Sequence, residues 1–186
     1  MRVIAGKYRS RPLGSLRGLD LRPTADRLRE TLFNVLTAGN PLALEGTVWL
    51  DLYAGTGAVG IEALSRGADK VYFVESSPRV VELIRKNLSL LDITTGFEIL
   101  KQDVCHALAK FEKNSMDFAF LDPPYRMRNE YQRTLESLGG SRWLKENGLV
   151  IAEHDKKFDP GQSFGPLQRV RQLKQGDAAL SFYRYE

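Results

Sequence analysis

A carboxylate, two prolines and a tyrosine end an apolar run in residues 116–125, MDFAFLDPPY. The run predicts a buried strand, which the prolines end because proline fixes its φ angle and has no backbone N–H to donate. They would hold the carboxylate of Asp122 and the ring of Tyr125 at fixed points on the rim of the sheet. The candidate catalytic residues are therefore Asp122, Pro123, Pro124 and Tyr125, and a turn that only ends the strand is the alternative.

A glycine pattern, Gly55-x-Gly57-x-x-Gly60, lies between the first predicted strand and the helix that follows it. Glycine lets the backbone turn tightly and lets a ligand lie close against it. Glu75 ends the second predicted strand, 20 residues after Gly55. A carboxylate at that place can accept hydrogen bonds from both hydroxyls of a ribose, so the pattern predicts a nucleoside-containing cofactor over the strand ends.

Two aspartates indicate which cofactor this is. Asp51 lies four residues before Gly55, and its charge would repel the pyrophosphate that NAD brings to a helix N-terminus. The same charge suits the sulfonium and ammonium groups of S-adenosylmethionine (SAM). Asp103 ends the third strand, where it can accept from an adenine amino group. Alternatively, Asp51 caps the glycine loop and Asp103 caps the next helix. The predicted cofactor site also includes the neighbouring residues Ala54, Ser76 and Val104.

Strands and helices alternate around these residues. Apolar runs predict strands at 47–53, 70–76, 97–103, 116–122 and 148–154, and helical spacing predicts helices at 25–39, 59–67, 77–91, 104–112, 129–139 and 141–146. Two alternating runs, 167–175 and 179–186, meet around Gly176-Asp177 and predict a hairpin. The fold class is therefore α/β: a doubly wound, Rossmann-like, seven-stranded, mostly parallel sheet with a C-terminal antiparallel hairpin.

Composition narrows the setting. A chain of 186 residues is long enough for one domain with a substantial core. No apolar run approaches the roughly 18 residues of a membrane span, and the single cysteine, Cys105, fits a reducing compartment, so we expect a cytoplasmic protein with no membrane partner. His106 and His154 lack partners at metal-ligand spacing, so no metal is expected.

The sequence now resembles the class I SAM-dependent methyltransferases, through DxxxGxG, the acids that end strands two and three, DPPY after strand four and the closing hairpin. The segments RVIAGKYRSRPL and LRPTADRLRETLFNVL further resemble the bacterial 16S rRNA guanine-N2 methyltransferases, the RsmD family. One departure is Ser10, where the family often has glycine. The resemblance covers nearly the whole chain and is weakest from about 155 to 175.

This resemblance implies methyl transfer from SAM to an exocyclic guanine amine of small-subunit rRNA, in a subunit that is partly assembled. An exocyclic amine is a poor nucleophile, because its lone pair is delocalised into the ring. Asp122 can accept one N–H and the Pro123 carbonyl another, which aims the lone pair at the methyl group. Tyr125 offers a face on which the base can stack.

The basic charge is concentrated at the N-terminus. Residues 1–40 hold eight Lys or Arg against three acids, whereas the remaining residues sum to −1. This favours a polyanionic partner, with a solvated basic terminus as the alternative. We divide the chain into a basic arm with its first helix (1–40) and a SAM-dependent methyltransferase domain (41–186), and we expect a monomer. The candidate RNA-binding residues are Arg2, Lys7, Arg9, Arg11, Arg22, Thr24 and Arg27.

Three other functions are weighed against this one. A DNA or RNA adenine-N6 methyltransferase uses the same DPPY turn but lacks the RPTxDRxRE segment. An NAD-dependent oxidoreductase is disfavoured by Asp51 and DPPY. A noncatalytic RNA-binding module is disfavoured because the set of glycines and acids is complete.

Overall fold

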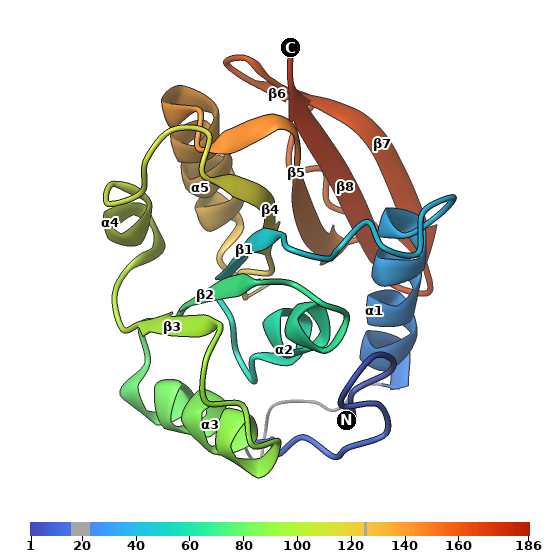
Figure 1. The fold of residues 1–186 in the computed structure, drawn as a ribbon. Helices are drawn as coiled ribbons and strands as arrows, with labels where there is room; N and C mark the ends of the chain where they lie inside the picture. The colour runs from blue at the N-terminus through green and yellow to red at the C-terminus, as the bar shows by residue number, and fades with distance from the viewer. Residues whose placement is uncertain (16–22, 125) are drawn as a thin grey trace.

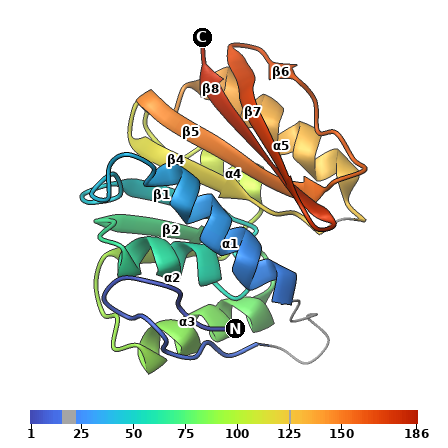
Figure 2. The ribbon, with the colours of Figure 1, turned by 90° about the vertical axis from the view of Figure 1, so that its right-hand side faces the viewer.

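One sheet runs through the molecule, with helices on both faces (Figures 1 and 2). The structure, a computed structural model, describes residues 1–15, 23–124 and 126–186. The order of the strands is β3-β2-β1-β4-β5-β8-β7-β6. The strands are β1 (Val48–Leu52), β2 (Lys70–Val74), β3 (Phe97–Leu100), β4 (Met116–Leu121), β5 (Leu144–Asp155), β6 (Ser163–Phe164), β7 (Leu167–Gln175) and β8 (Ala178–Tyr185).

The first five strands are parallel and the last three antiparallel. The predicted fold class is confirmed, with all seven expected strands in the expected arrangement. The eighth, β6, was not predicted, because two residues are too few for an alternating pattern to be recognised. It pairs with β7, at the edge of the sheet.

The helices form two layers that bury two separate cores. One core lies under α1, α2 and α3 and includes Phe33, Trp49 and Phe73, whereas the other lies under α4 and α5 and includes Leu121 and Tyr131. Parallel strands buried on both faces need such cover. The bounds are α1 (Pro23–Leu36), α2 (Ala58–Ser65), α3 (Pro78–Leu90), α4 (Val104–Leu108) and α5 (Arg128–Ser141).

The predicted helix at 141–146 is wrong. The α5 helix ends at Ser141, and β5 begins at Leu144, which pairs with Met116 of β4. Both Trp143 and Leu144 are buried, and the ammonium of Lys145 lies 2.7 Å from the carboxylate of Asp117. Tertiary burial therefore overrides the local helical preference of this segment.

The N-terminal arm, residues 1–15, packs against α2 and α3 (Figure 2). The Ile4 and Ala5 N–H groups donate to the carboxylate of Glu62 on α2, at 2.7 and 2.9 Å. Gly6 has a φ of 79°, and a Cβ there would lie 1.8 Å from the Ser65 carbonyl oxygen. Only glycine fits this close turn. The arm is thus part of the folded body.

Candidate active site

Three carboxylates from adjacent strands face one cavity of about 150 Å³. Each lies two residues after a residue of the α1–α3 core: Asp51 after Trp49, Asp122 after Phe120 and Glu153 after Ile151. Side chains two apart along a strand share a face. Three neighbouring parallel strands therefore bring their acids to the same face, at their carboxyl ends, where α/β sheets bind ligands.

Asp51 is buried, with 2% of its surface exposed, and its Oδ2 accepts from the Gly60 N–H at 2.9 Å. Burial raises the pKa of Asp51 to about 8, although this hydrogen bond opposes the shift. The side chain therefore anchors the start of α2, the capping role that the sequence left open. Since it also lines the cavity, it remains available to a cationic ligand.

Asp122 and Glu153 are half-buried and adjacent, because they follow the paired residues Leu121 and Ala152. Burial raises the pKa of Asp122 to about 7. Burial and then the charge of Asp122 raise the pKa of Glu153 well above its ordinary value, whereas Arg29 lowers it. Two carboxylates this close do not ionise independently, so a proton or a cationic ligand stabilises the pair.

The glycine loop borders the same cavity through Ala54 and Gly55. Gly55 and Gly57 have φ angles of 56° and 77°, and a Cβ on Gly55 would approach nothing closer than the Tyr53 carbonyl oxygen at 3.8 Å. The space in front of Gly55 is thus open to a ligand. Glu75 accepts from the Gly55 N–H (3.3 Å) and the Ser77 N–H (2.9 Å), and its remaining lone pairs can accept from ribose hydroxyls. Ser76 beside it is exposed.

Asp103 caps α4 rather than standing free. Its Oδ1 accepts from the Cys105 N–H at 2.9 Å, and Arg133 of α5 pairs with it at 2.9 Å. Burial opposes the resulting shift, but Arg133 and these N–H groups together lower the pKa of Asp103. The capping alternative is therefore what this structure shows for Asp103, with the adjacent Val104 buried.

Two residues of the DPPY turn face different surroundings: Asp122 lines the cavity, whereas the Pro123 carbonyl faces Tyr131 of α5. Pro123 is buried, and its carbonyl accepts weakly from the Tyr131 hydroxyl at 3.4 Å, while Pro124 is exposed and its carbonyl accepts from Met127 N–H. The Tyr131 hydroxyl also donates to the Glu153 carbonyl at 2.8 Å. Tyr125 lies outside the described residues.

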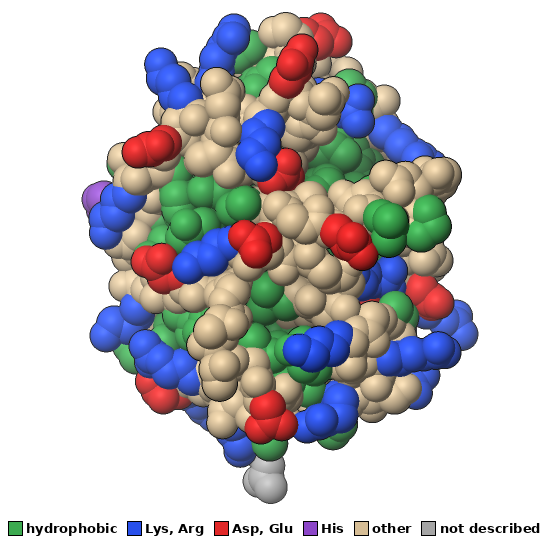
Figure 3. All heavy atoms as spheres, in the orientation of Figure 1, with side chains coloured by type: hydrophobic (Ala, Val, Ile, Leu, Met, Phe, Trp, Pro, Cys, Tyr) green, Lys and Arg blue, Asp and Glu red, His purple; other side chains and the backbone are tan. Residues whose placement is uncertain are grey.

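The arm places most candidate RNA-binding residues at the surface. Arg2, Lys7, Arg9 and Arg11 are exposed, and Figure 3 shows Lys and Arg side chains along the lower part of the molecule. Arg11 also donates to the Leu90 carbonyl at the end of α3. Arg27 is exposed on α1, whereas Arg22 and the side chain of Thr24 lie outside the described part.

Three functional candidates were missed by sequence reasoning. Glu153 was read as an ordinary strand residue, although it directly follows Ala152, the last β5 residue paired with β4, as Asp122 follows Leu121. Arg29 was interpreted as a member of a surface or internal ion pair. It lines the cavity, and 5% of its surface is exposed. Tyr53 has a φ of 60° and shares its hydroxyl with Glu130 (2.9 Å) and Thr134 (2.8 Å), which ties the glycine loop to α5.

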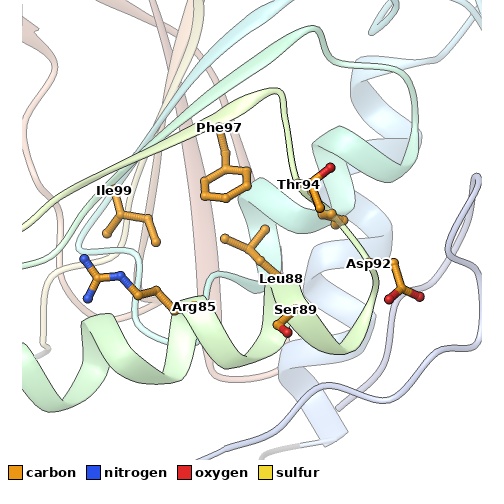
Figure 4. A pocket seen from close by; sticks show the side chains of 8 residues that line it. Arg85, Leu88, Ser89, Asp92, Thr94, Phe97 and Ile99 are labelled. Atoms are coloured by element: carbon orange, nitrogen blue, oxygen red, sulfur yellow. The ribbon is translucent and has the colours of Figure 1, made fainter.

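A larger cavity, of about 460 Å³, lies between α3 and β3 (Figure 4). Phe97 and Leu88 face one another there, with Arg85 and Asp92 at its ends. None of the predicted site residues that the structure describes lines it. In the described part of the chain, no group of His, Cys and acidic residues could hold a metal ion, and no helix is long and apolar enough to cross a membrane.

The strand order and the carboxylates at the strand ends define a SAM-dependent methyltransferase fold. A family model described as "Conserved hypothetical protein 95" matches residues 1–184. The chain belongs to this RsmD-like family of methyltransferases, as the sequence predicted.

The chain is similar to known proteins over most of their length. The chain is 33% identical to "Putative rRNA methyltransferase YlbH" of Bacillus subtilis, over 99% of this chain and 98% of that protein. It is 37% identical to "Ribosomal RNA small subunit methyltransferase D" of Haemophilus influenzae, over 84% and 79%. Among solved structures, "Putative methyltransferase yhhF" from Escherichia coli aligns with a TM-score of 0.82 and 30% identity, over 100% and 98% of the two chains.

Proposed function

We propose that this protein transfers a methyl group from SAM to the exocyclic N2 of a guanine in small-subunit (16S) rRNA, within a partly assembled subunit. The observation that carries the proposal is the Asp122–Glu153 pair, which faces the cavity beside the glycine loop. Family membership and the names of the relatives supply the substrate class. The enzyme would act as a cytoplasmic monomer without a metal.

The residues around the cavity fit SAM. Desolvated carboxylates favour a cation, and the open space at Gly55 leaves room for a nucleoside against the backbone. Asp51 would attract the cationic end and Glu75 would hold the ribose. Ser76 would lie beside the ribose, with Ala54 and Val104 along the nucleoside. Asp103 would reach the adenine only in part, since Arg133 already pairs with it. The donor supplies an electrophilic methyl group.

Asp122 would first orient the amine and then accept a proton from it. Its carboxylate accepts one N2–H, which directs the nitrogen lone pair toward the methyl group. As the N–CH₃ bond forms and the S–CH₃ bond breaks, sulfur keeps the electron pair and positive charge develops on N2. Ionised Asp122 stabilises that charge and takes the proton that N2 loses. Pro123 would offer its carbonyl as a second acceptor, with Pro124 and Tyr125 shaping the place of the base.

The arm would supply affinity without reading bases. Arg2, Lys7 and Arg9 are exposed and can contact phosphates, whereas Arg11 is shared with α3. Arg22, Thr24 and Arg27 would also contact the RNA. Buried Asn87 joins the arm to the glycine loop, because its Nδ2 donates to the Thr56 carbonyl at 2.8 Å and its Oδ1 accepts from Gly14 N–H.

Incubation with labelled SAM and unmodified small subunits, followed by nucleoside analysis, tests the function. We expect N2-methylguanosine in 16S rRNA. Recovery of N6-methyladenosine would instead support the adenine enzyme, and label on no nucleoside would contradict RNA methylation altogether.

Replacing Glu75 with alanine is expected to weaken SAM binding by about 1–3 kcal/mol, since hydrogen bonds to a charged group are lost. Titration calorimetry measures the change. Glu98→Ala is the matched control, because Glu98 is an exposed acid on the neighbouring β3 strand. Equal affinity in the two folded variants would remove Glu75 from the site.

A further inference from the structure

Asp122 and Glu153 present acceptors that the protein leaves open. Among the described residues, no group donates a hydrogen bond to either carboxylate, although both line the cavity. Buried polar groups in proteins are almost always hydrogen-bonded. A pair of unpartnered carboxylates in one cavity therefore calls for a ligand that brings two donors.

Arg29 adds a donor to the same cavity. It is 5% exposed, and its Nε has no hydrogen-bond partner within the described part of the chain. Its terminal nitrogen donates to the Arg2 carbonyl (2.5 Å) and to Asp26 (3.2 Å), so neither of these bonds goes to Glu153. Its charge nevertheless stabilises ionised Glu153.

The three groups line one cavity. Glu153 lies next to Asp122, because these residues follow the paired residues Ala152 and Leu121, and Arg29 lines the cavity from α1. The cavity thus offers two neighbouring acceptors, Asp122 and Glu153, and a donor, Arg29.

The base-pairing edge of guanine is the complement of this set, with N1–H next to the N2 that the proposed function gives to Asp122. It presents the O6 acceptor, the N1–H donor and the N2–H donor. Adenine presents one donor beside the N1 acceptor, which would face a carboxylate with its lone pair. A donor–acceptor–acceptor set therefore matches guanine and repels adenine.

We propose that Glu153 selects guanine by accepting its N1–H, while Arg29 donates to O6 and Asp122 holds the reacting N2. This inference rests on the proposed function and deepens it, since it assigns base choice to a residue outside the DPPY turn. A purely structural Glu153 would serve only to neutralise Arg29, but Asp26 and Glu62 already surround that guanidinium.

The test compares two target bases in reconstituted small subunits. The 16S rRNA carries either guanosine or 2-aminopurine riboside at the position that the wild type methylates. 2-Aminopurine keeps the exocyclic amine at C2 but has neither N1–H nor O6. Single-turnover methylation is measured for the wild type, Glu153→Gln and a control, Glu146→Gln, an exposed glutamate on the same β5 strand.

We expect the wild type and the control to prefer guanine by about 10- to 100-fold, in line with the discrimination of a good base-reading contact. Glu153→Gln loses the negative charge but keeps an acceptor oxygen, and its amide N–H can donate to the bare N1 of 2-aminopurine. It should therefore be slower on guanine and no slower on 2-aminopurine, so that the preference narrows to a few-fold. SAM affinity should not change, which confirms that the variant is folded. Glu153→Asp, which keeps the charge, should retain part of the preference.

Two results would overturn the inference. If Glu153→Gln slows methylation of both bases by the same factor, the residue acts on the site as a whole; if it changes neither rate, the residue does not contact the base. Failure of the proposed function is recognised separately, because the wild type would then place no methyl on guanine N2 in ordinary subunits.

Discussion

An Asp122→Ala enzyme is expected to lose about 10²- to 10⁴-fold in kcat, the range that a positioned proton acceptor contributes. Its KM for the subunit should change far less, because in the proposed mechanism Asp122 acts on the amine chiefly in the transition state. SAM binding should be nearly intact, since the proposed cofactor contacts are the glycine loop, Asp51 and Glu75. Single-turnover methylation of unmodified subunits measures the loss.

The pH dependence of the rate is a second test of the role of Asp122. Burial raises its pKa to about 7, and the ionised form is the one that accepts a proton. The wild-type rate should therefore rise as pH increases through about 7 and then level off, with an apparent pKa that belongs to the Asp122–Glu153 pair. Asp122→Asn keeps the shape but cannot ionise, so this rise should disappear. Asp69→Asn, an exposed aspartate, is the control. A folded Asp122→Ala enzyme with near-normal kcat would contradict the assigned role.

Replacing Glu62 with alanine is expected to destabilise the fold by about 3–5 kcal/mol, the cost of breaking a buried charge network. The side chain is fully buried on α2 and accepts from Ile4 N–H, Ala5 N–H and Arg66 Nε. Its loss would leave two backbone donors of the arm and the Arg66 guanidinium without their partner. Urea unfolding measures the change in the free energy of unfolding.

Glu82→Ala is the matched control for Glu62. Glu82 pairs with Arg85 on α3, but both side chains are more than half exposed. An exposed pair of this kind contributes about 0–1 kcal/mol. Similar losses in the two variants would mean that Glu62 does not fasten the arm.

The alternation of strands and helices was sufficient to predict the parallel sheet, because buried strands and their connecting helices have recognisable apolar patterns. It failed at 141–146, where the helical spacing of SRWLKE yields to the pairing of Leu144 with Met116. That contact joins residues 28 positions apart, and no local pattern contains it.

Some residues of the candidate site could be predicted from the sequence and others could not. The glycines, Asp51 and Asp122 lie in recognisable motifs, which is why they were predicted. Glu153 carries no motif, and it enters the site only because β5 lies in register beside β4. A rule that examines the residues near the carboxyl end of each parallel strand for an acid would have found it. Asp103 shows the opposite difficulty, a motif residue whose role the sequence does not decide. An aspartate at this position can cap the helix or contact a ligand, and here it caps the helix.

The attachment of the arm has a consequence for the order in which the chain folds. Its hydrogen bonds to Glu62, Ser65, Asn87 and Leu90 span 57 to 79 residues. Closing loops of that length costs entropy before any contact compensates for it. The arm is made before all of its partners, and it cannot dock until α2 and α3 have left the ribosome. The basic arm therefore remains undocked, beside ribosomal RNA, for much of the synthesis of the chain.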